Sequence, residues 1–200
     1  AAERIRTTDL GSRSDHVAAE LANVETTLTE ADDAALAALV DRITDLDRPV
    51  MVLSSDASAG VAQQFVIQLH QLRPHVSMVS GSDVEVRREL AVADDSATLV
   101  VIDLRRYEQW VLDAHQLAVE RGLWSAGVTD SMLSPIASAA DVTFVVGAAS
   151  TGPFDSYVGV LALLDLVAID VAAQLKDSAT ERLAAIEASW TARPSLTTGR

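Results

Sequence analysis

The 200-residue sequence contains no cysteine, only 4% aromatic residues, and only 15 lysine and arginine residues against 29 acidic residues. Without cysteine, disulfide bonds and thiolate metal ligands are excluded, so packing must stabilise the fold. The formal net charge of -14 does not provide the basic surface that binds a phosphate backbone, so we expect no direct contact with DNA or RNA. A glycine-rich dinucleotide or P-loop fingerprint is also missing, and we expect no cofactor.

The length and the 49% hydrophobic content predict one globular domain with a substantial core. No basic start followed by an apolar run is present, so no signal peptide is readable and a cytoplasmic location is expected. Residues 157–175 approach the length of a membrane span, but Asp165 and Asp170 interrupt them. We interpret this segment as a buried helix and expect no membrane contact.

Two helices are predicted before the first strand. Residues 1–14 are polar and without a period, which is typical of a tail or linker, and four apolar residues then repeat at helical spacing on one stripe. These four residues are Val17, Leu21, Val24 and Leu28. Thr29 and Asp32 resemble a capping box that opens a second helix. Its apolar face is formed by Leu36, Leu39, Val40, Ile43 and Leu46.

Five short apolar runs then alternate with helical stretches. The runs occupy residues 50–53, 76–79, 99–102, 124–128 and 142–146. Continuous apolarity is typical of strands covered on both faces, so the pattern predicts an α/β fold with three α-β-α layers and a five-stranded parallel sheet. Ligands bind such sheets at the carboxyl ends of the strands, near the switch in strand order.

The helix expected over residues 155–175 is apolar on more than one face. It is either a core helix or a core helix that also forms a dimer interface, because an apolar surface must be covered. A last helix is expected near residues 178–190. The predicted domain therefore covers residues 15–190, and residues 191–200 form a polar tail.

Hydroxyl side chains follow the first and fourth strands. Ser54, Ser55 and Ser58 lie where a helix begins, so that hydroxyls and free N–H groups there can hold an anion. The alternative is that one serine caps the helix and the others are solvated. A similar loop after the fourth strand contains Thr129, Ser131 and Ser134.

This second loop belongs to the segment GVTDSMLSPIASAAD, residues 127–141, which resembles the TDS-x-x-SP-x-A-x-x-AD signature of sugar isomerase (SIS) domains. Within SIS proteins the sequence is most similar, over about residues 15–175, to the effector domain of RpiR-type transcriptional regulators. The resemblance implies a flavodoxin-like SIS fold in which Ser54, Ser55 and Ser58 line the first ligand loop. It also implies that Thr129, Ser131 and Ser134 lie beside the site.

One loop departs from the family pattern. Many SIS domains follow the third strand with a hydroxyl-rich loop that binds the sugar phosphate, whereas this chain has Asp103, Arg105 and Arg106 in the segment DLRRY. Each arginine can bind a phosphate or carboxylate bidentately, or one arginine can pair with Asp103 and stiffen the loop. The resemblance also places the start of the last long helix near the ligand, which makes Ser156 and Asp155 second-rank candidates.

Catalysis is not indicated by the histidines. A phosphosugar isomerase needs a base and an acid, usually glutamate with histidine, and none of the four histidines follows a predicted strand. Glu85 and Glu89 are interpreted as solvated helical residues. No spacing indicates a metal site, so we expect no catalytic and no metal-binding residues.

The predicted function is therefore a dimeric effector domain that senses a phosphosugar or a related anionic sugar derivative. We expect a homodimer or a dimer of dimers, and contact with DNA only through an N-terminal helix-turn-helix domain that this chain lacks. Two alternatives remain open: an aldose–ketose phosphosugar isomerase, and a dimerisation scaffold with a degenerate pocket.

Overall fold

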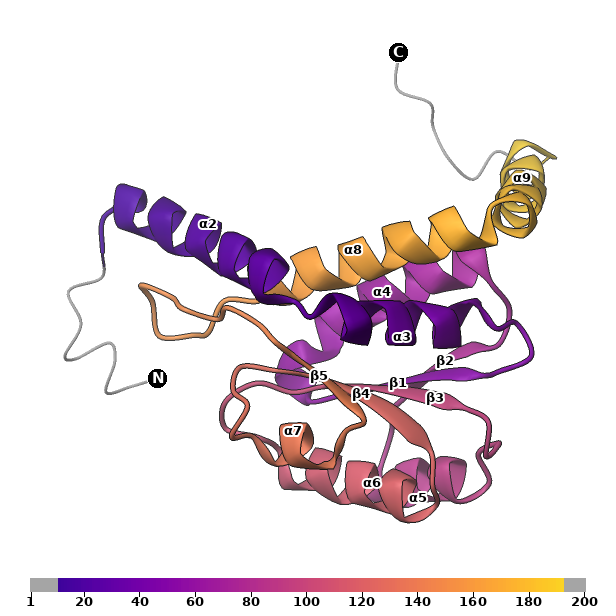
Figure 1. The fold of residues 1–200 in the computed structure, drawn as a ribbon, viewed down its shortest axis with the longest axis horizontal. Coiled ribbons are helices and arrows are strands. Elements are labelled where there is room, and N and C mark those ends of the chain that lie inside the picture. The colour runs from indigo at the N-terminus through magenta and orange to yellow at the C-terminus, as the bar shows by residue number, and fades with distance from the viewer. Residues whose placement is uncertain (1–10, 193–200) are drawn as a thin grey trace.

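The computed structural model describes residues 11–192 and consists of five strands and eight α-helices within that range (Figure 1). The strands are β1 (Val50–Ser54), β2 (Val76–Val79), β3 (Thr98–Ile102), β4 (Trp124–Thr129) and β5 (Val142–Val145). The helices are α2 (Arg13–Glu30), α3 (Asp33–Thr44), α4 (Ala59–Leu72), α5 (Asp83–Ala91), α6 (Gln109–Glu120), α7 (Pro135–Ala139), α8 (Val158–Leu175) and α9 (Asp177–Ala192), and a 3₁₀ turn, η1 (Asp56–Ser58), precedes α4. All five predicted strands are confirmed. Most of the predicted tails, 1–14 and 191–200, lies outside the described residues.

The strands form one parallel sheet in the order β2-β1-β3-β4-β5. This is the flavodoxin-like order, and its switch point lies between β1 and β3. The register pairs Val50 with Thr98 and Ser54 with Ile102, so the two strands end side by side. The loops that follow β1 and β3 therefore emerge next to each other at the edge where ligands are expected.

Helices cover both faces of the sheet, which confirms the predicted three layers. The helices α2, α3, α4 and α8 lie on one side, and α5, α6 and α7 on the other (Figure 1). Each interface has its own apolar core, one containing Val52, Val100 and Leu163 and the other Leu53, Leu99 and Val111. The alternation of side chains along each strand fills both cores, which is why the runs are continuously apolar.

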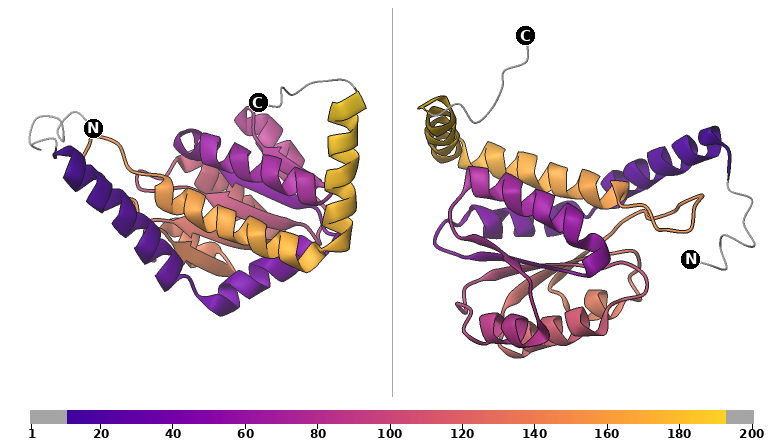
Figure 2. Two further views of the ribbon diagram at one scale, coloured as in Figure 1. Left: turned by 90° about the horizontal axis from the view of Figure 1, so that it is seen from above. Right: turned by 180° about the vertical axis from the view of Figure 1, so that it is seen from behind.

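The helix α8 is long and apolar enough to cross a membrane by composition alone. Seen from above, it instead lies between α4 and the α2–α3 pair (Figure 2), and it contacts all three helices. Asp165 on its outer side accepts a hydrogen bond of 2.6 Å from Gln68. Burial of Val160, Leu163, Val167 and neighbouring residues makes it a core helix of this domain, as predicted. It begins at Val158 rather than at residue 155.

The helix α2 forms where its apolar stripe predicts, but it buries a different face. Val17 and Leu21 are 50% and 65% exposed, whereas Asn23 and Thr27 are buried against the loop after β5. Polar contacts decide the orientation: the Asn23 Nδ2 donates to Ala149 O (2.8 Å), and Gly147 N donates to Thr27 Oγ1 (2.8 Å). A buried main-chain group without a partner would be costly, so these side chains face inward.

The second helix is capped by one residue rather than by the predicted box. Asp32 is the N-cap of α3 and accepts a hydrogen bond of 2.7 Å from Ala35 N. Thr29 belongs to α2, where its hydroxyl donates to Glu25 O at 2.7 Å. The predicted capping box is therefore wrong, although the acidic N-cap still places α3, and Leu39, Val40 and Ile43 are buried as expected.

Candidate functional site

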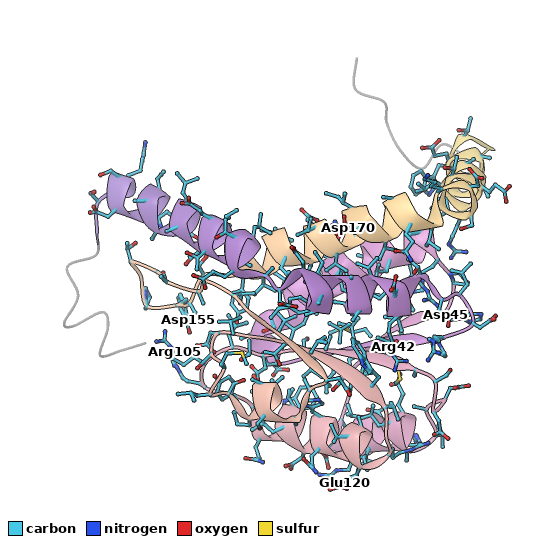
Figure 3. All side chains as sticks on the ribbon, viewed as in Figure 1. Arg42, Asp45, Arg105, Glu120, Asp155 and Asp170 are labelled. Atoms are coloured by element: carbon cyan, nitrogen blue, oxygen red, sulfur yellow. The ribbon has the colours of Figure 1, made fainter. Side chains whose placement is uncertain are left out.

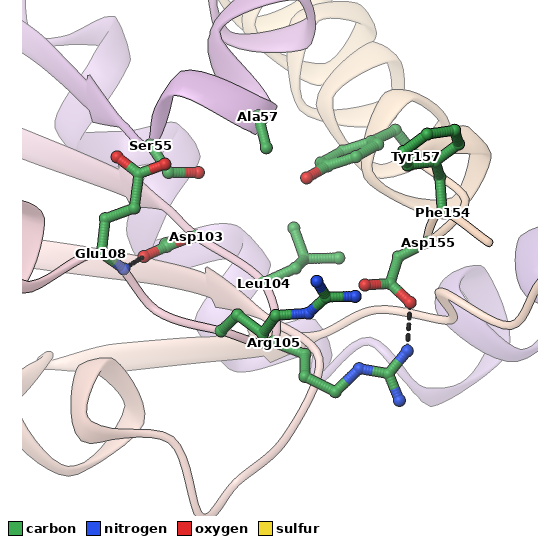
Figure 4. Close-up of a pocket in the computed structure, with 10 residues that line it drawn as sticks. Ser55, Ala57, Asp103, Leu104, Arg105, Glu108, Phe154, Asp155 and Tyr157 are labelled. Carbon is green, nitrogen blue, oxygen red and sulfur yellow. Dashed lines mark hydrogen bonds and ion pairs between the residues drawn. The ribbon is translucent and has the colours of Figure 1, made fainter. Parts of the chain in front are cut away.

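A cavity of about 250 Å³ lies at the switch point between β1 and β3. Three segments surround it: the turn after β1, the loop after β3 and the loop that leads into α8 (Figure 4). Its lining residues are Ser55, Ala57, Asp103, Leu104, Arg105, Arg106, Glu108, Phe154, Asp155 and Tyr157. Four of the predicted site residues are thus brought together here: Ser55, Asp103, Arg105 and Arg106.

The serines after β1 form a buried hydroxyl pair. Ser55 Oγ donates to Ser58 Oγ at 3.0 Å, and both residues are almost fully buried. Ser58 is the N-cap of α4 by position but makes no side-chain capping bond, so the simple capping alternative does not describe it. Ser54 ends β1 and does not line the cavity, and its buried Oγ has no hydrogen-bond partner in the described part of the chain.

Glu108 occupies the position beside this turn where an anion was expected. Its Oε2 accepts hydrogen bonds from the main-chain N–H of Asp56 (3.3 Å) and from Trp110 Nε1 (2.6 Å). The first N–H group of η1 therefore already faces a carboxylate of the protein. Sequence reasoning missed Glu108, because nothing in the DLRRY segment indicated that the next residue would fold back over the turn.

Asp103 is a buried carboxyl group in the wall of the cavity. It is 2% exposed, and its Oδ2 accepts a hydrogen bond of 2.9 Å from Glu108 N. Burial raises the pKa of Asp103 above its ordinary value, and the nearby Glu108 carboxylate acts in the same direction. A carboxyl group in this environment is a good hydrogen-bonding partner for ligand hydroxyls.

The two arginines lie on the loop after β3, and the ion pair they form is not the one considered from the sequence. Arg105 pairs with Asp155 across the cavity mouth rather than with Asp103 (Figures 3 and 4). Its side chain is 50% exposed, so a ligand can reach it. Arg106 lines the same cavity with φ at 71°, a left-handed conformation that is uncommon outside glycine and asparagine.

Asp130 fixes the conformation of this arginine loop. Its Oδ1 accepts hydrogen bonds from Arg105 N and from the Tyr107 hydroxyl, both at 2.9 Å. Burial raises the pKa of Tyr107, so that the hydroxyl remains a donor. Asp130 was quoted within the sequence signature but was not a candidate. Its acidic side chain one residue after β4 was the available signal.

The hydroxyl residues after β4 do not reach the cavity wall. Ser134 Oγ caps α7 by accepting from Ala137 N (3.0 Å), and Ser131 Oγ accepts from Leu133 N (3.1 Å). Thr129 is buried, and its Oγ1 has no partner among the described residues. A second, polar cavity of about 330 Å³ adjoins this region and shares Arg105 with the first.

Ser156 serves the attachment of α2 rather than the cavity. Its hydroxyl donates to the Glu20 carboxylate of α2 and accepts from Val158 N at 3.2 Å. The preceding residue, Asp155, does line the cavity. The segment before α8 therefore approaches the cavity as expected, through Asp155 rather than through Ser156.

No histidine lines the cavity. His115 is buried on α6, where it hydrogen-bonds Ser125 Oγ at 3.0 Å, and burial lowers its pKa. Glu85 closes a capping box with Ser82, and Glu89 also lies outside the cavity. Within residues 11–192, no group of three or more potential ligand side chains is placed to hold a metal ion.

Parallel α/β domains typically bind ligands at the switch point of the sheet, and the cavity there is lined by five charged side chains. A sequence model of the SIS domain matches residues 47–170, which is more than half of the chain. The chain therefore belongs to the SIS domain family.

Solved structures agree with this fold. The sugar isomerase domain of an RpiR transcription factor from Sphaerobacter thermophilus aligns with a TM-score of 0.82 and 24% identity, covering 88% of this chain and 97% of that one. Vibrio vulnificus NanR, complexed with ManNAc-6P, aligns with a TM-score of 0.79 and 16% identity over 92% and 70% of the two chains. A putative sugar-phosphate isomerase from Listeria monocytogenes aligns with a TM-score of 0.76 and 20% identity, covering 88% of this chain and 94% of that one. No curated protein sequence matches.

Proposed function

We propose that this chain is the cytoplasmic effector domain of an RpiR-type transcriptional regulator, and that its cavity senses a phosphosugar or a related anionic sugar derivative. The observation that carries the proposal is the composition of the cavity at the switch point. It combines two arginines with carboxyl and hydroxyl groups that suit a sugar, and it contains no histidine. This arrangement favours binding over proton transfer.

The arginines are the groups that would hold the anion. A guanidinium group binds phosphate or carboxylate oxygens bidentately, which gives both orientation and strength. Arg106 lines the cavity, and Arg105 reaches its mouth, where Asp155 now holds it. A ligand phosphate would compete with the Asp155 carboxylate for Arg105, so that binding would loosen the link between the β3 loop and the segment before α8.

That segment is in turn connected to α2. Asn23 makes two hydrogen bonds to the main chain of Ala149, at 2.8 and 3.0 Å, and Ser156 bonds Glu20. A change at Asp155 can therefore reach α2 and α8 through a short run of residues. A ligand shifts such an equilibrium only if it binds the two arrangements with different affinity.

We further propose that the domain is a homodimer or a dimer of dimers. Several apolar side chains are exposed on α2 and α8, two helices that contact each other. These side chains are Val17, Leu21, Leu28, Leu161 and Ile169. An apolar surface of this kind is typically covered by another protein surface. DNA would be contacted only by a helix-turn-helix domain N-terminal to this one, because the chain has a net charge of -14.

The structural neighbours support a sugar phosphate as the ligand class. NanR is described in complex with ManNAc-6P, and an Escherichia coli protein in complex with a different phosphosugar. The TM-scores of these two proteins are 0.79 and 0.71.

A thermal-shift screen tests the proposal. Phosphosugars, sugar acids and simple carboxylates would be tested against the wild type, Arg106→Ala, Ser58→Ala and Arg88→Ala, in which the last removes an exposed arginine outside the cavity. A ligand at a hundredfold excess over its Kd stabilises the protein by about 2.7 kcal/mol. A shift that Arg106→Ala reduces by about half or more and Arg88→Ala retains supports the sensor. If no compound raises the Tm of the folded wild type, a dimerisation scaffold with a degenerate pocket is favoured instead.

An isomerase is the second candidate, favoured by one specific observation. Asp103 and Glu108 place two carboxyl groups in the cavity, and burial raises the pKa of Asp103. An aldose–ketose isomerase would exchange the proton next to the carbonyl with solvent. NMR in D₂O would measure deuterium incorporation into the sugar phosphates that bind. Incorporation that Glu108→Gln abolishes would identify the protein as an isomerase rather than a sensor.

A further inference from the structure

The two sides of the cavity present different groups. In Figure 4, Glu108, Ser55 and Asp103 lie together on one side, and Asp155, held by Arg105, lies on the other. Leu104 separates the two groups. A ligand that fills the cavity therefore meets hydrogen-bond acceptors at one end and the Arg105 guanidinium group at the other.

The carboxylate of Glu108 is held in place before any ligand arrives. Its Oε2 accepts hydrogen bonds from Trp110 Nε1 and from Asp56 N, at 2.6 and 3.3 Å, whereas no hydrogen bond within the described chain reaches its Oε1. Glu108 thus places a fixed negative charge on the first N–H group of η1. The N–H group of Asp56 is therefore already occupied, and Glu108 presents one acceptor oxygen for a ligand donor.

The charges in the cavity do not favour a second anionic group. Three carboxyl groups, those of Asp103, Glu108 and Asp155, face two guanidinium groups. A single phosphate is matched by Arg105 and Arg106. A second carboxylate or phosphate at the opposite end would meet Glu108 directly, and juxtaposed like charges in a partly buried site strongly weaken binding.

From this arrangement we infer that Glu108 is a specificity-determining residue. It selects sugar derivatives with one anionic group, bound at the arginines, and uncharged hydroxyls at the other end. It rejects phosphosugar acids and bisphosphates. This inference rests on the proposed function and adds to it the charge distribution of the ligand. The sugar acids of the thermal-shift screen are bound only if the acid is the sole anionic group.

Matched ligand pairs test the inference. Glucose 6-phosphate and 6-phosphogluconate differ by oxidation of one terminal carbon, as do ribose 5-phosphate and its aldonate. Isothermal titration at pH 7 would give the Kd of each with the wild type, Glu108→Gln and Glu181→Gln. Glutamine retains an acceptor for Trp110 Nε1 and Asp56 N, and Glu181 is an exposed residue of α9 far along the chain from the cavity.

We expect the wild type to bind the neutral-ended sugar phosphate at least about tenfold more tightly than its acid. Glu108→Gln should reduce this ratio towards one by improving binding of the acid, and Glu181→Gln should leave it unchanged. A wild-type ratio of one or below, which needs no variant to measure, would overturn the inference while leaving the sensor intact. A ratio that Glu108→Gln does not change would assign the selectivity elsewhere. If neither these pairs nor any phosphosugar of the thermal-shift screen binds the wild type, the proposed function fails together with the inference.

Discussion

Replacing Asn23 with alanine tests how firmly α2 is attached to the loop that carries Asp155. The side chain makes two hydrogen bonds to Ala149, one to its carbonyl oxygen (2.8 Å) and one from its N–H (3.0 Å). Each such bond contributes about 1 kcal/mol, and Ala149 is exposed enough for water to replace them in part. Alanine recovers up to about 0.7 kcal/mol of helix propensity. The net expected loss of unfolding free energy is therefore about 1 kcal/mol.

The matched control for this substitution is Thr26→Ala on the same helix. Thr26 is exposed, and its hydroxyl makes no hydrogen bond among the described residues, whereas the gain in helix propensity is similar. For a protein of this size, about 1 kcal/mol corresponds to about 2–4 °C in Tm. Urea unfolding followed by circular dichroism measures both variants. If Asn23→Ala lowers the free energy of unfolding by no more than Thr26→Ala does, the hydrogen bonds of Asn23 do not hold α2 in place.

Three further predictions concern two buried ionisable residues and one residue with a left-handed backbone. Arg73 is fully buried and donates to four main-chain carbonyls between residues 43 and 48. Arg73→Met should therefore lower the free energy of unfolding by at least about 3 kcal/mol. A change below about 1 kcal/mol in urea unfolding would contradict this prediction. Asp103→Asn should be more stable than the wild type at pH 7, because the raised pKa of Asp103 means that its ionisation opposes folding. The wild type gains stability as pH falls through that raised pKa towards the ordinary value of about 3.9. The gap between the two proteins should therefore shrink in melts from pH 7 down to pH 4, and a gap that widens would refute the reasoning. Arg106→Gly relieves a left-handed backbone and should raise stability by about 0–1 kcal/mol while removing ligand binding; a marked fall in Tm would show that Arg106 serves the fold instead.

Most of the sheet could be predicted because its signal is local. Each strand is a short apolar run, and both faces of each strand must be covered, so runs such as residues 50–53 and 99–102 indicate buried parallel strands without further information. The burial of α2 could not be predicted in the same way. Its apolar stripe at Val17 and Leu21 is real, but Asn23 and Thr27 satisfy main-chain groups more than a hundred residues away. Partners at that separation leave no periodic signal.

The site was predictable to the extent that it follows from strand ends. Ser55, Asp103, Arg105 and Arg106 follow β1 and β3, which are adjacent in the sheet, and they meet in one cavity. Glu108 could not be predicted, because its role depends on a hydrogen bond from Asp56 N that only the geometry of the loop creates.

The hydroxyl residues after β4 lie in the expected loop but do not line the cavity. Ser131 and Ser134 are hydroxyl residues in the expected place, yet a turn N–H and a helix N-terminus use their oxygens. A hydroxyl in a loop does not reveal whether it serves the backbone or a ligand.

The most direct test of the account is the affinity of the arginine cavity for a sugar phosphate. The ligand that gives the largest thermal shift would be titrated calorimetrically into the wild type, Arg106→Ala and Arg88→Ala. Loss of a charge-assisted hydrogen bond costs about 1.5–3 kcal/mol, so Arg106→Ala should weaken binding by at least about tenfold, and Arg88→Ala should bind like the wild type. Equal affinity in all three proteins would contradict the assignment of this cavity as the sensing site.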